Sequence, residues 1–324
     1  MEFSEIQKLS QRVKENIQKV IVGKGEIIDL MLVALIASGH ILLEDVPGMG
    51  KTLLAKSTAK SMALSFKRVQ FTPDLLPTDI SGLNYYNQRA GEFVFRPGPV
   101  FTNILLADEI NRATPRTQSS LLECMEERQV TMDGETRSLE SPFMVIATQN
   151  PVEIQGTFPL PEAQLDRFLL KIRMGYPTTA EGKEILKRFK DAAPLEEIGP
   201  VAGREEILDA QKSYSGVHVS DDILSYIMEI AEKTRIHTDL ILGVSPRGSQ
   251  ALLKCAQAWA VIHGRDYVMP DDVKRLVKPV LGHRIILKNT SRMKENYGDY
   301  ILDQILKEIP VPAEADIPEQ GKDA

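Results

Sequence analysis

The sequence predicts an α/β domain built on a parallel sheet, followed by an all-helical domain, and three features of the chain lead to this prediction. In the first half, short apolar runs alternate with amphipathic segments of helical period. A glycine-rich turn directly follows the first apolar run and precedes a helical segment. Beyond Gly175-Tyr176-Pro177, long amphipathic stretches continue without a convincing strand.

Each predicted strand is a short apolar run bounded by polar or turn residues. Helical segments such as 53–64 and 117–128 separate several of these runs, as parallel pairing requires. Two more helices, joined by a turn at 22–25, precede the first strand. The predicted strands are 41–43, 68–71, 104–107, 143–147 and 168–172, and the later helices are 181–192, 203–212, 220–234, 246–263 and 270–280.

These patterns divide the chain into three parts. We expect the α/β domain with its N-terminal helices at 1–175 and the helical domain at 176–311. Residues 312–324 are rich in Pro, Glu, Asp and Ala, so we expect a flexible tail there.

The composition excludes several classes of protein. Of the 324 residues, 43% are hydrophobic and 26% are charged, which is typical of a globular chain. The longest apolar run, 30–37, has eight residues, whereas a membrane helix needs about 20. The N-terminus is charged from its second residue, so we expect no secretion signal and a cytoplasmic location. The formal charge of −6 does not favour nucleic acid as a partner, and Cys124 and Cys255 are interpreted as buried thiols.

The glycine-rich turn has the pattern of a loop that binds phosphate groups. Its glycines allow backbone N–H groups to approach the phosphates, Lys51 can reach the β and γ phosphates, and the Thr52 hydroxyl can bind Mg²⁺. Asp45 stands where the consensus has its first glycine, so the carboxylates of Glu44 and Asp45 must point away from the ligand. An ordinary glycine turn with a surface lysine is the alternative. The predicted nucleotide-binding residues are Gly48, Met49, Gly50, Lys51, Thr52 and Leu53.

A pair of acidic residues ends the third predicted strand. Asp108 and Glu109 follow the apolar run 104–107, and successive side chains on a strand point in opposite directions. We expect Asp108 to support Mg²⁺ and Glu109 to orient the attacking water. Taken alone, such a pair also occurs at the start of a loop or helix.

Together with these motifs, further segments show that the chain resembles the MoxR family of AAA+ ATPases over nearly its whole length. The resemblance implies an AAA+ P-loop core, a helical lid domain, ATP as cofactor and hydrolysis of ATP to ADP and phosphate. Those segments are PGPVF at 97–101, DEINR at 108–112, LLECMEERQV at 121–130, ATQNP at 147–151 and LPEAQLDRF at 160–168.

The resemblance also assigns roles to four polar residues. Asn150 resembles the sensor that contacts the γ-phosphate or the attacking water, although an Asn-Pro pair also forms simple turns. Arg167 resembles the arginine finger that reaches the nucleotide of a neighbouring subunit, and its alternative is a surface charge facing Asp166. Arg247, after the predicted helix cap Ser245-Pro246, resembles the second sensor. Arg112 could also serve the interface in place of Arg167.

Two segments resemble insertions of the family, and they are candidates for binding client proteins. Segment 85–99 resembles the family's insert in the second helix, and segment 130–139, with a hairpin-like turn at 132–135, resembles the hairpin before the first sensor. An ordinary surface loop and hairpin are the alternative. If these are the family's insertions, Tyr85, Tyr86, Phe93 and Phe95 could hold an apolar client. The resemblance implies a ring of six subunits that remodels or assembles other proteins, with a partner carrying a von Willebrand factor A domain. The alternatives are a nucleic-acid motor and a slow nucleotide-dependent switch.

Overall fold

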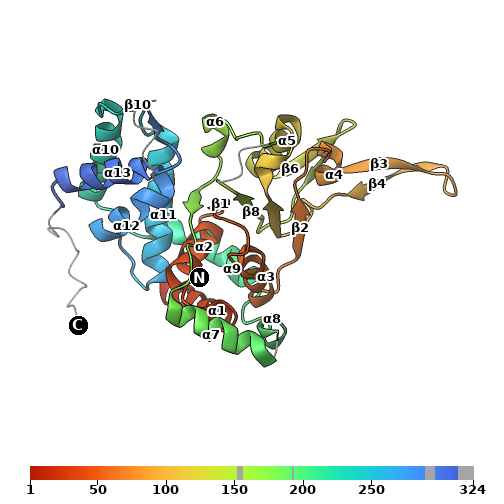
Figure 1. Cartoon of the computed structure of the whole chain (residues 1–324), viewed down its shortest axis with the longest axis horizontal. Helices are drawn as coiled ribbons and strands as arrows, with labels where there is room; N and C mark the ends of the chain where they lie inside the picture. The colour runs from red at the N-terminus through yellow and green to blue at the C-terminus, as the bar shows by residue number, and fades with distance from the viewer. Residues whose placement is uncertain (152–155, 192, 289–295, 313–324) are drawn as a thin grey trace, which may run out of the picture.

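The computed structural model describes residues 1–151, 156–191, 193–288 and 296–312, so the predicted tail lies almost wholly outside the described residues. A five-stranded parallel sheet with the order β2-β5-β8-β1-β9 forms the centre of the α/β part (Figure 1). Each predicted strand is confirmed to within two residues at its ends. The strands are β1 (Ile41–Glu44), β2 (Phe66–Gln70), β5 (Ile104–Asp108), β8 (Met144–Gln149) and β9 (Leu170–Ile172).

The side chains of this sheet alternate between two apolar layers, because successive residues of a strand face opposite ways. On β1, Ile41 and Leu43 pack into a core that also contains the first three helices and the C-terminal helices. Leu42 packs into a second core on the other face, against α5 (Pro115–Glu127). Since both faces of the sheet are covered, its central strands β1, β5 and β8 appear in the sequence as largely apolar runs, whereas the edge strand β2 carries exposed Lys67 and Arg68.

Helices and two hairpins complete the α/β part. The first three helices are α1 (Phe3–Gln18), α2 (Gly25–Ile36) and α3 (Lys51–Ser61), followed by the short α4 (Pro77–Ser81) and α6 (Glu162–Leu165). One hairpin, β3 (Gly82–Asn87) with β4 (Glu92–Pro97), projects from the molecule, and the other consists of β6 (Gln129–Met132) and β7 (Glu135–Ser138) (Figure 1). Both segments predicted as insertions therefore contain hairpins.

The chain beyond β9 is helical, as predicted. Helix α11 (Pro246–Ile262) packs along α1 and α2, so the N-terminal and C-terminal helices share one apolar core. A short antiparallel pair, β10 (Leu240–Leu242) with β11 (Ile286–Leu287), was not predicted. Strands this short have too few residues to show an alternating pattern. The helices are α7 (Thr179–Asp191), α8 (Pro194–Glu197), α9 (Arg204–Ser213), α10 (Asp221–Ile236), α11 (Pro246–Ile262), α12 (Pro270–Leu281) and α13 (Tyr297–Glu308). None of the helices in the described ranges is long and apolar enough to cross a membrane.

A completely buried histidine lies where the chain enters β1. His40 Nδ1 accepts a hydrogen bond from the Val145 N–H (3.0 Å), and Nε2 lies 3.0 Å from the Met125 carbonyl. The neutral ring with its proton on Nε2 satisfies both contacts. Burial, with the nearby charge of Arg128, lowers the pKa of His40 to about 3.

This histidine makes the folded protein sensitive to acid. Because the pKa is about 6.5 in the unfolded chain and about 3 in the fold, the unfolded chain binds the proton first as the pH falls. The contribution is fully present above pH 6.5 and is lost toward pH 3. We expect the unfolding free energy, measured in urea, to fall by about 2 kcal/mol more between pH 7.5 and 5 in the wild type than in His40→Asn. Parallel pH profiles would contradict this prediction.

Candidate active site

The glycine-rich turn joins β1 to α3 and has the backbone that a phosphate-binding loop needs. Gly48 and Gly50 have φ values of +84° and +83°, in the left-handed region that favours glycine. A Cβ atom at either position would meet nothing within 4 Å, so the backbone conformation, and not lack of space, favours glycine there. Helix α3 begins at Lys51, two residues earlier than predicted, so Lys51 and Thr52 lie in its first turn. The N–H groups of that turn are available to an anion.

Lys51 connects the loop to the acidic pair at the end of β5. Its Nζ donates a hydrogen bond to the Asp45 carbonyl (2.7 Å). Burial lowers the pKa of Lys51, while the carboxylates of Asp108, Asp45 and Glu109 oppose that shift. The lysine is therefore within electrostatic reach of both acids.

The two carboxylates that border the loop point away from it, as predicted. Glu44 forms ion pairs with Lys171 (3.5 Å) and Arg173 (2.7 Å). Burial opposes ionisation of Glu44, yet these two cations outweigh it and hold its pKa below the ordinary value. Asp45 accepts hydrogen bonds from the backbone N–H groups of Met174 (2.5 Å) and Gly175 (3.2 Å).

The carboxylates of Asp108 and Glu109 contact different side chains, but not because they alternate along a strand, as the sequence predicted. Glu109 lies past the end of β5 in the left-handed conformation (φ 57°), so the expected alternation does not apply to it. Thr148 links the two residues, because its hydroxyl donates to Asp108 Oδ1 (2.6 Å) and accepts from the Glu109 N–H (2.8 Å). Asp108 also pairs with Arg68 (2.6 Å) on β2.

The Glu109 carboxylate is held by two donors of its own protomer. Gln70 Nε2 donates to Glu109 Oε2 (2.8 Å), and Arg112 Nη1 lies 3.0 Å from the same oxygen. Arg112 is thus engaged within its own protomer. Asn150 follows β8, which pairs with both β1 and β5, so it lies at the same carboxyl edge of the sheet as Lys51 and Asp108.

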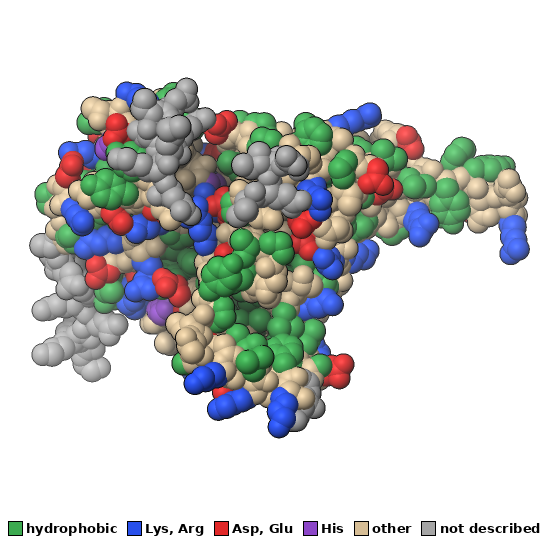
Figure 2. Space-filling model, viewed as in Figure 1, with side chains coloured by type: hydrophobic (Ala, Val, Ile, Leu, Met, Phe, Trp, Pro, Cys, Tyr) green, Lys and Arg blue, Asp and Glu red, His purple; other side chains and the backbone are tan. Residues whose placement is uncertain are grey.

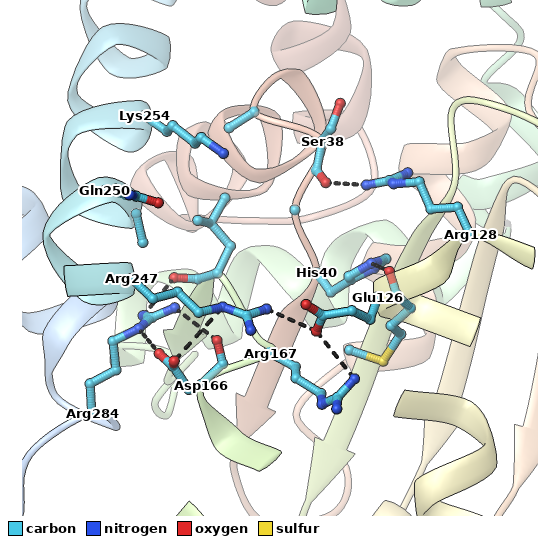
Figure 3. A pocket seen from close by; sticks show the side chains of 15 residues that line it. Ser38, His40, Glu126, Arg128, Asp166, Arg167, Arg247, Gln250, Lys254 and Arg284 are labelled. Carbon is cyan, nitrogen blue, oxygen red and sulfur yellow. Dashed lines mark hydrogen bonds and ion pairs between the residues drawn. The ribbon is translucent and has the colours of Figure 1, made fainter. Parts of the chain in front are cut away.

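Arg167 and Arg247 lie at the opposite edge of the sheet. They line a cavity of about 600 Å³ with Ser38 and His40, which precede β1 (Figure 3). Glu126 bridges the two arginines, at 3.1 Å from Arg167 and 3.0 Å from Arg247. The loop follows β1, and four strand residues at about 3.3 Å each separate the two edges by more than 10 Å. A single protomer therefore does not bring all the predicted site residues together.

The cavity at this edge carries an excess of positive charge. Asp166 pairs with the deeply buried Arg284 (2.6 Å) and lies 3.7 Å from Arg247, whereas Arg167 pairs with Glu126 and not with its neighbour Asp166. Ser245 caps α11 as predicted, accepting from the Gly248 N–H (3.2 Å), and this cap positions Arg247 in the first turn. The cations that line the cavity are Arg128, Arg167, Arg247, Lys254 and Arg284, against the carboxylates of Glu126 and Asp166.

A smaller apolar cavity of about 240 Å³ lies beside the loop. Gly48, Met49, Gly50 and Leu53 form one side of it, which places the predicted Met49 and Leu53 against this space. The other sides consist of residues 20–22 and 24 between α1 and α2, residues 174, 175 and 177 after β9, and Ile185 and Phe189 of α7. Its position and apolar lining suit a nucleobase whose phosphates occupy the loop.

Comparison with known proteins agrees with this arrangement. The model of the ATPase family associated with various cellular activities (AAA) matches residues 40–170, and that of the AAA lid domain matches residues 232–305. The chain is 51% identical to the uncharacterised Bacillus subtilis protein YeaC (93% of this chain, 94% of that protein). It is 38% identical to the Mycobacterium tuberculosis protein named Chaperone MoxR1 (98% and 86%). The chain belongs to the MoxR family of AAA+ ATPases.

A solved structure supports the same fold for this MoxR-family chain. A crystal structure from Cytophaga hutchinsonii superposes with a TM-score of 0.90 at 38% identity, covering 96% of this chain and 97% of that one. Membership of the AAA+ ATPases makes the chain a nucleotide-binding protein of the ATPase class.

Several polar residues of this MoxR-family site were not identified from the sequence. Thr148 is the polar link between Asp108 and Glu109, and its place two residues before Asn150 at the end of an apolar run was the available signal. Glu126 falls inside a segment that carries the family resemblance, but no pattern there indicates that it contacts two arginines. Arg284 is 118 positions from its partner Asp166, so only the fold brings them together.

Proposed function

We propose that the protein hydrolyses ATP with Mg²⁺ in a head-to-tail ring, and that it uses this hydrolysis to remodel, mature or assemble client proteins. The observation that carries the proposal is the separation of the site into two halves. The phosphate-binding loop and the acidic pair lie at one edge of the sheet, and the Arg167–Arg247 cavity lies at the other. A contact between unlike surfaces closes into a ring or continues as a filament. A ring of six is the expectation from the family.

The residues at the carboxyl edge suit the first half of the reaction. The N–H groups of the loop and Lys51 would bind the phosphates, and Thr52 with Asp108 would hold Mg²⁺, whose charge reduces repulsion on the transferred phosphoryl group. The electrostatic influence of Asp108 on Lys51 supports the placement of both residues at one phosphate site. Glu109, held by Gln70 and Arg112, would orient the attacking water. Asn150 would contact the γ-phosphate or that water.

The cavity at the opposite edge of the sheet suits the second half of the site, which would act on the nucleotide of a neighbouring protomer. Its excess of cations is complementary to the triphosphate of a neighbouring protomer. Arg167 and Arg247 share one carboxylate, Glu126, so both side chains would reach the neighbour's nucleotide from the same place. We therefore propose that Arg167 is the finger and that Arg247 acts in trans beside it, whereas Arg112 serves its own Glu109.

The projecting hairpin suits contact with a client. Tyr85, Tyr86 and Phe93 are 44%, 54% and 74% exposed, and apolar side chains are visible along the hairpin in Figure 2. Phe95 instead packs against Phe101 and lies 4.3 Å below the Arg137 guanidinium of the second hairpin, so it is not part of the exposed surface. Exposed aromatic groups on a rigid support are typical anchors for protein partners. A protein with a von Willebrand factor A domain is the proposed partner.

Capture of this partner tests the client-directed function. Glu109→Gln should bind ATP without turning it over, so we expect it to retain a protein with a von Willebrand factor A domain in ATP but not in ADP. Phe93→Ser in the same background should lose most of the captured partner while binding ATP equally well. Equal capture by both variants would remove the hairpin from the proposal. DNA-stimulated turnover that falls with salt would instead favour a nucleic-acid motor.

A further inference from the structure

The segment between β9 and α7 is held from two sides by charged groups. The Asp45 carboxylate accepts from the N–H groups of Met174 and Gly175, at 2.5 Å and 3.2 Å. The Lys24 ammonium donates to the carbonyls of Met174 (2.8 Å), Gly175 (3.1 Å) and Tyr176 (3.3 Å). We call Met174–Tyr176 the clamped segment. Its backbone is thus bonded through both its donors and its acceptors.

Each of the two charged groups has enough hydrogen-bonding sites for all the backbone groups that it contacts. A carboxylate has two oxygens that each accept one N–H, and an ammonium group has three protons for three carbonyls. Bonds to charged groups are stronger than neutral ones, so the clamp restrains the segment firmly. Asp45 belongs to the phosphate-binding loop and Lys24 to the turn between α1 and α2, so the segment is fixed relative to two separate elements.

The clamped segment forms a wall of the apolar cavity beside the loop. Met174, Gly175 and Lys24 line this cavity together with Gly48 and Gly50 of the loop. The position of this wall relative to the loop therefore decides whether a base can fill the cavity while its phosphates occupy the loop. This contact accounts for the aspartate at position 45, where the consensus of such loops has glycine. A glycine has no carboxylate that could bind the backbone of this wall.

We infer that Asp45 and Lys24 are positioning residues for the nucleobase: by clamping Met174–Tyr176 they fix the distance between the base cavity and the phosphate-binding loop. The inference rests on the proposed nucleotide site. The phosphates are bound by the loop N–H groups and Lys51, whereas the clamp is made by Lys24 and by the Asp45 carboxylate, which points away from the loop. Loss of the clamp therefore weakens contacts with the base and leaves contacts with the phosphates.

Two variants and a matched control test this inference by calorimetric titration with ADP, GDP and inorganic tripolyphosphate. In Asp45→Asn an amide group faces one of the N–H donors, and in Lys24→Met the ammonium is lost while the stem remains. We expect each variant to bind ADP and GDP about tenfold more weakly. Tripolyphosphate affinity should be unchanged in Lys24→Met and should not fall in Asp45→Asn, which removes a negative charge near Lys51. Lys60 also donates to two carbonyls, of Leu195 (2.7 Å) and Glu196 (3.5 Å), away from the cavity, so Lys60→Met should match the wild type.

The outcomes separate this inference from the function on which it rests. Unchanged ADP affinity in both variants, or a parallel loss of tripolyphosphate affinity, would overturn the positioning role. A wild type that binds neither ADP nor tripolyphosphate would instead overturn the proposed nucleotide site. The double variant should lose less than the sum of the two single losses, because both residues hold one segment. Circular dichroism at each step verifies that the variants are folded.

Discussion

Mixing Arg167→Ala protomers with Glu109→Gln protomers is expected to restore ATP hydrolysis that neither variant shows alone. Each homogeneous variant should be slower than the wild type by about 10³-fold or more, since an arginine finger has effects of this size where it has been measured. In a mixed ring, an intact Glu109 can face an intact Arg167 of the next protomer. Random assembly of equal amounts should restore about a quarter of wild-type phosphate release.

Mixtures with other variants of the same site serve as controls for this measurement. Glu109→Gln mixed with Lys51→Ala should stay inactive, because both changes affect the same half of the site and no complete site can form. Arg112→Ala mixed with Glu109→Gln should show no restoration beyond the activity of Arg112→Ala itself, since Arg112 contacts the Glu109 of its own protomer at 3.0 Å. Arg247→Ala should behave like Arg167→Ala in every mixture, because Glu126 holds both arginines in one cavity. Absence of restoration with Arg167→Ala would contradict the proposed trans arrangement.

Replacing Lys51 by alanine is expected to abolish detectable nucleotide binding while leaving the fold intact. The side chain is partly buried and burial lowers its pKa, so its charge costs free energy until a phosphate group compensates it. We expect a loss of affinity of about a hundredfold or more for ADP and ATP. The melting temperature without ligand should stay close to that of the wild type, and ADP should no longer raise it.

A second lysine of the same helix provides the control. Lys56 is exposed on α3, one turn beyond the loop, and Lys56→Ala should respond to ADP as the wild type does. A Lys51→Ala protein that ADP still stabilises fully would show that the loop does not bind phosphate through this residue. Lost stabilisation in both variants would point to damage of α3 instead.

The secondary structure could be predicted well because its signals are local. The runs at 41–43 and 104–107 are apolar throughout, since both faces of the sheet are covered. The phosphate-binding loop follows the first run, and the acidic residues Asp108 and Glu109 follow the second. The glycines of the loop are visible for a similar reason, because positive φ values can be anticipated from residue type. In contrast, the strand pair β10–β11 depends on pairing across more than 40 residues, and its short strands carry no pattern of their own.

The parallel α/β layout, the phosphate-binding loop and the acidic residues beside it could be predicted from the chain alone, because each is indicated by residues that are neighbours along it. In contrast, it is folding that brings Arg167 and Arg247 together at the opposite edge of the sheet, where both contact Glu126. Folding also brings Asp45 and Lys24 to the same segment, where Asp45 binds Met174 and Gly175 and Lys24 binds both of these and Tyr176. Such contacts join positions that are far apart in the chain, and packing of the sheet and helices, not local propensity, brings them within hydrogen-bonding distance.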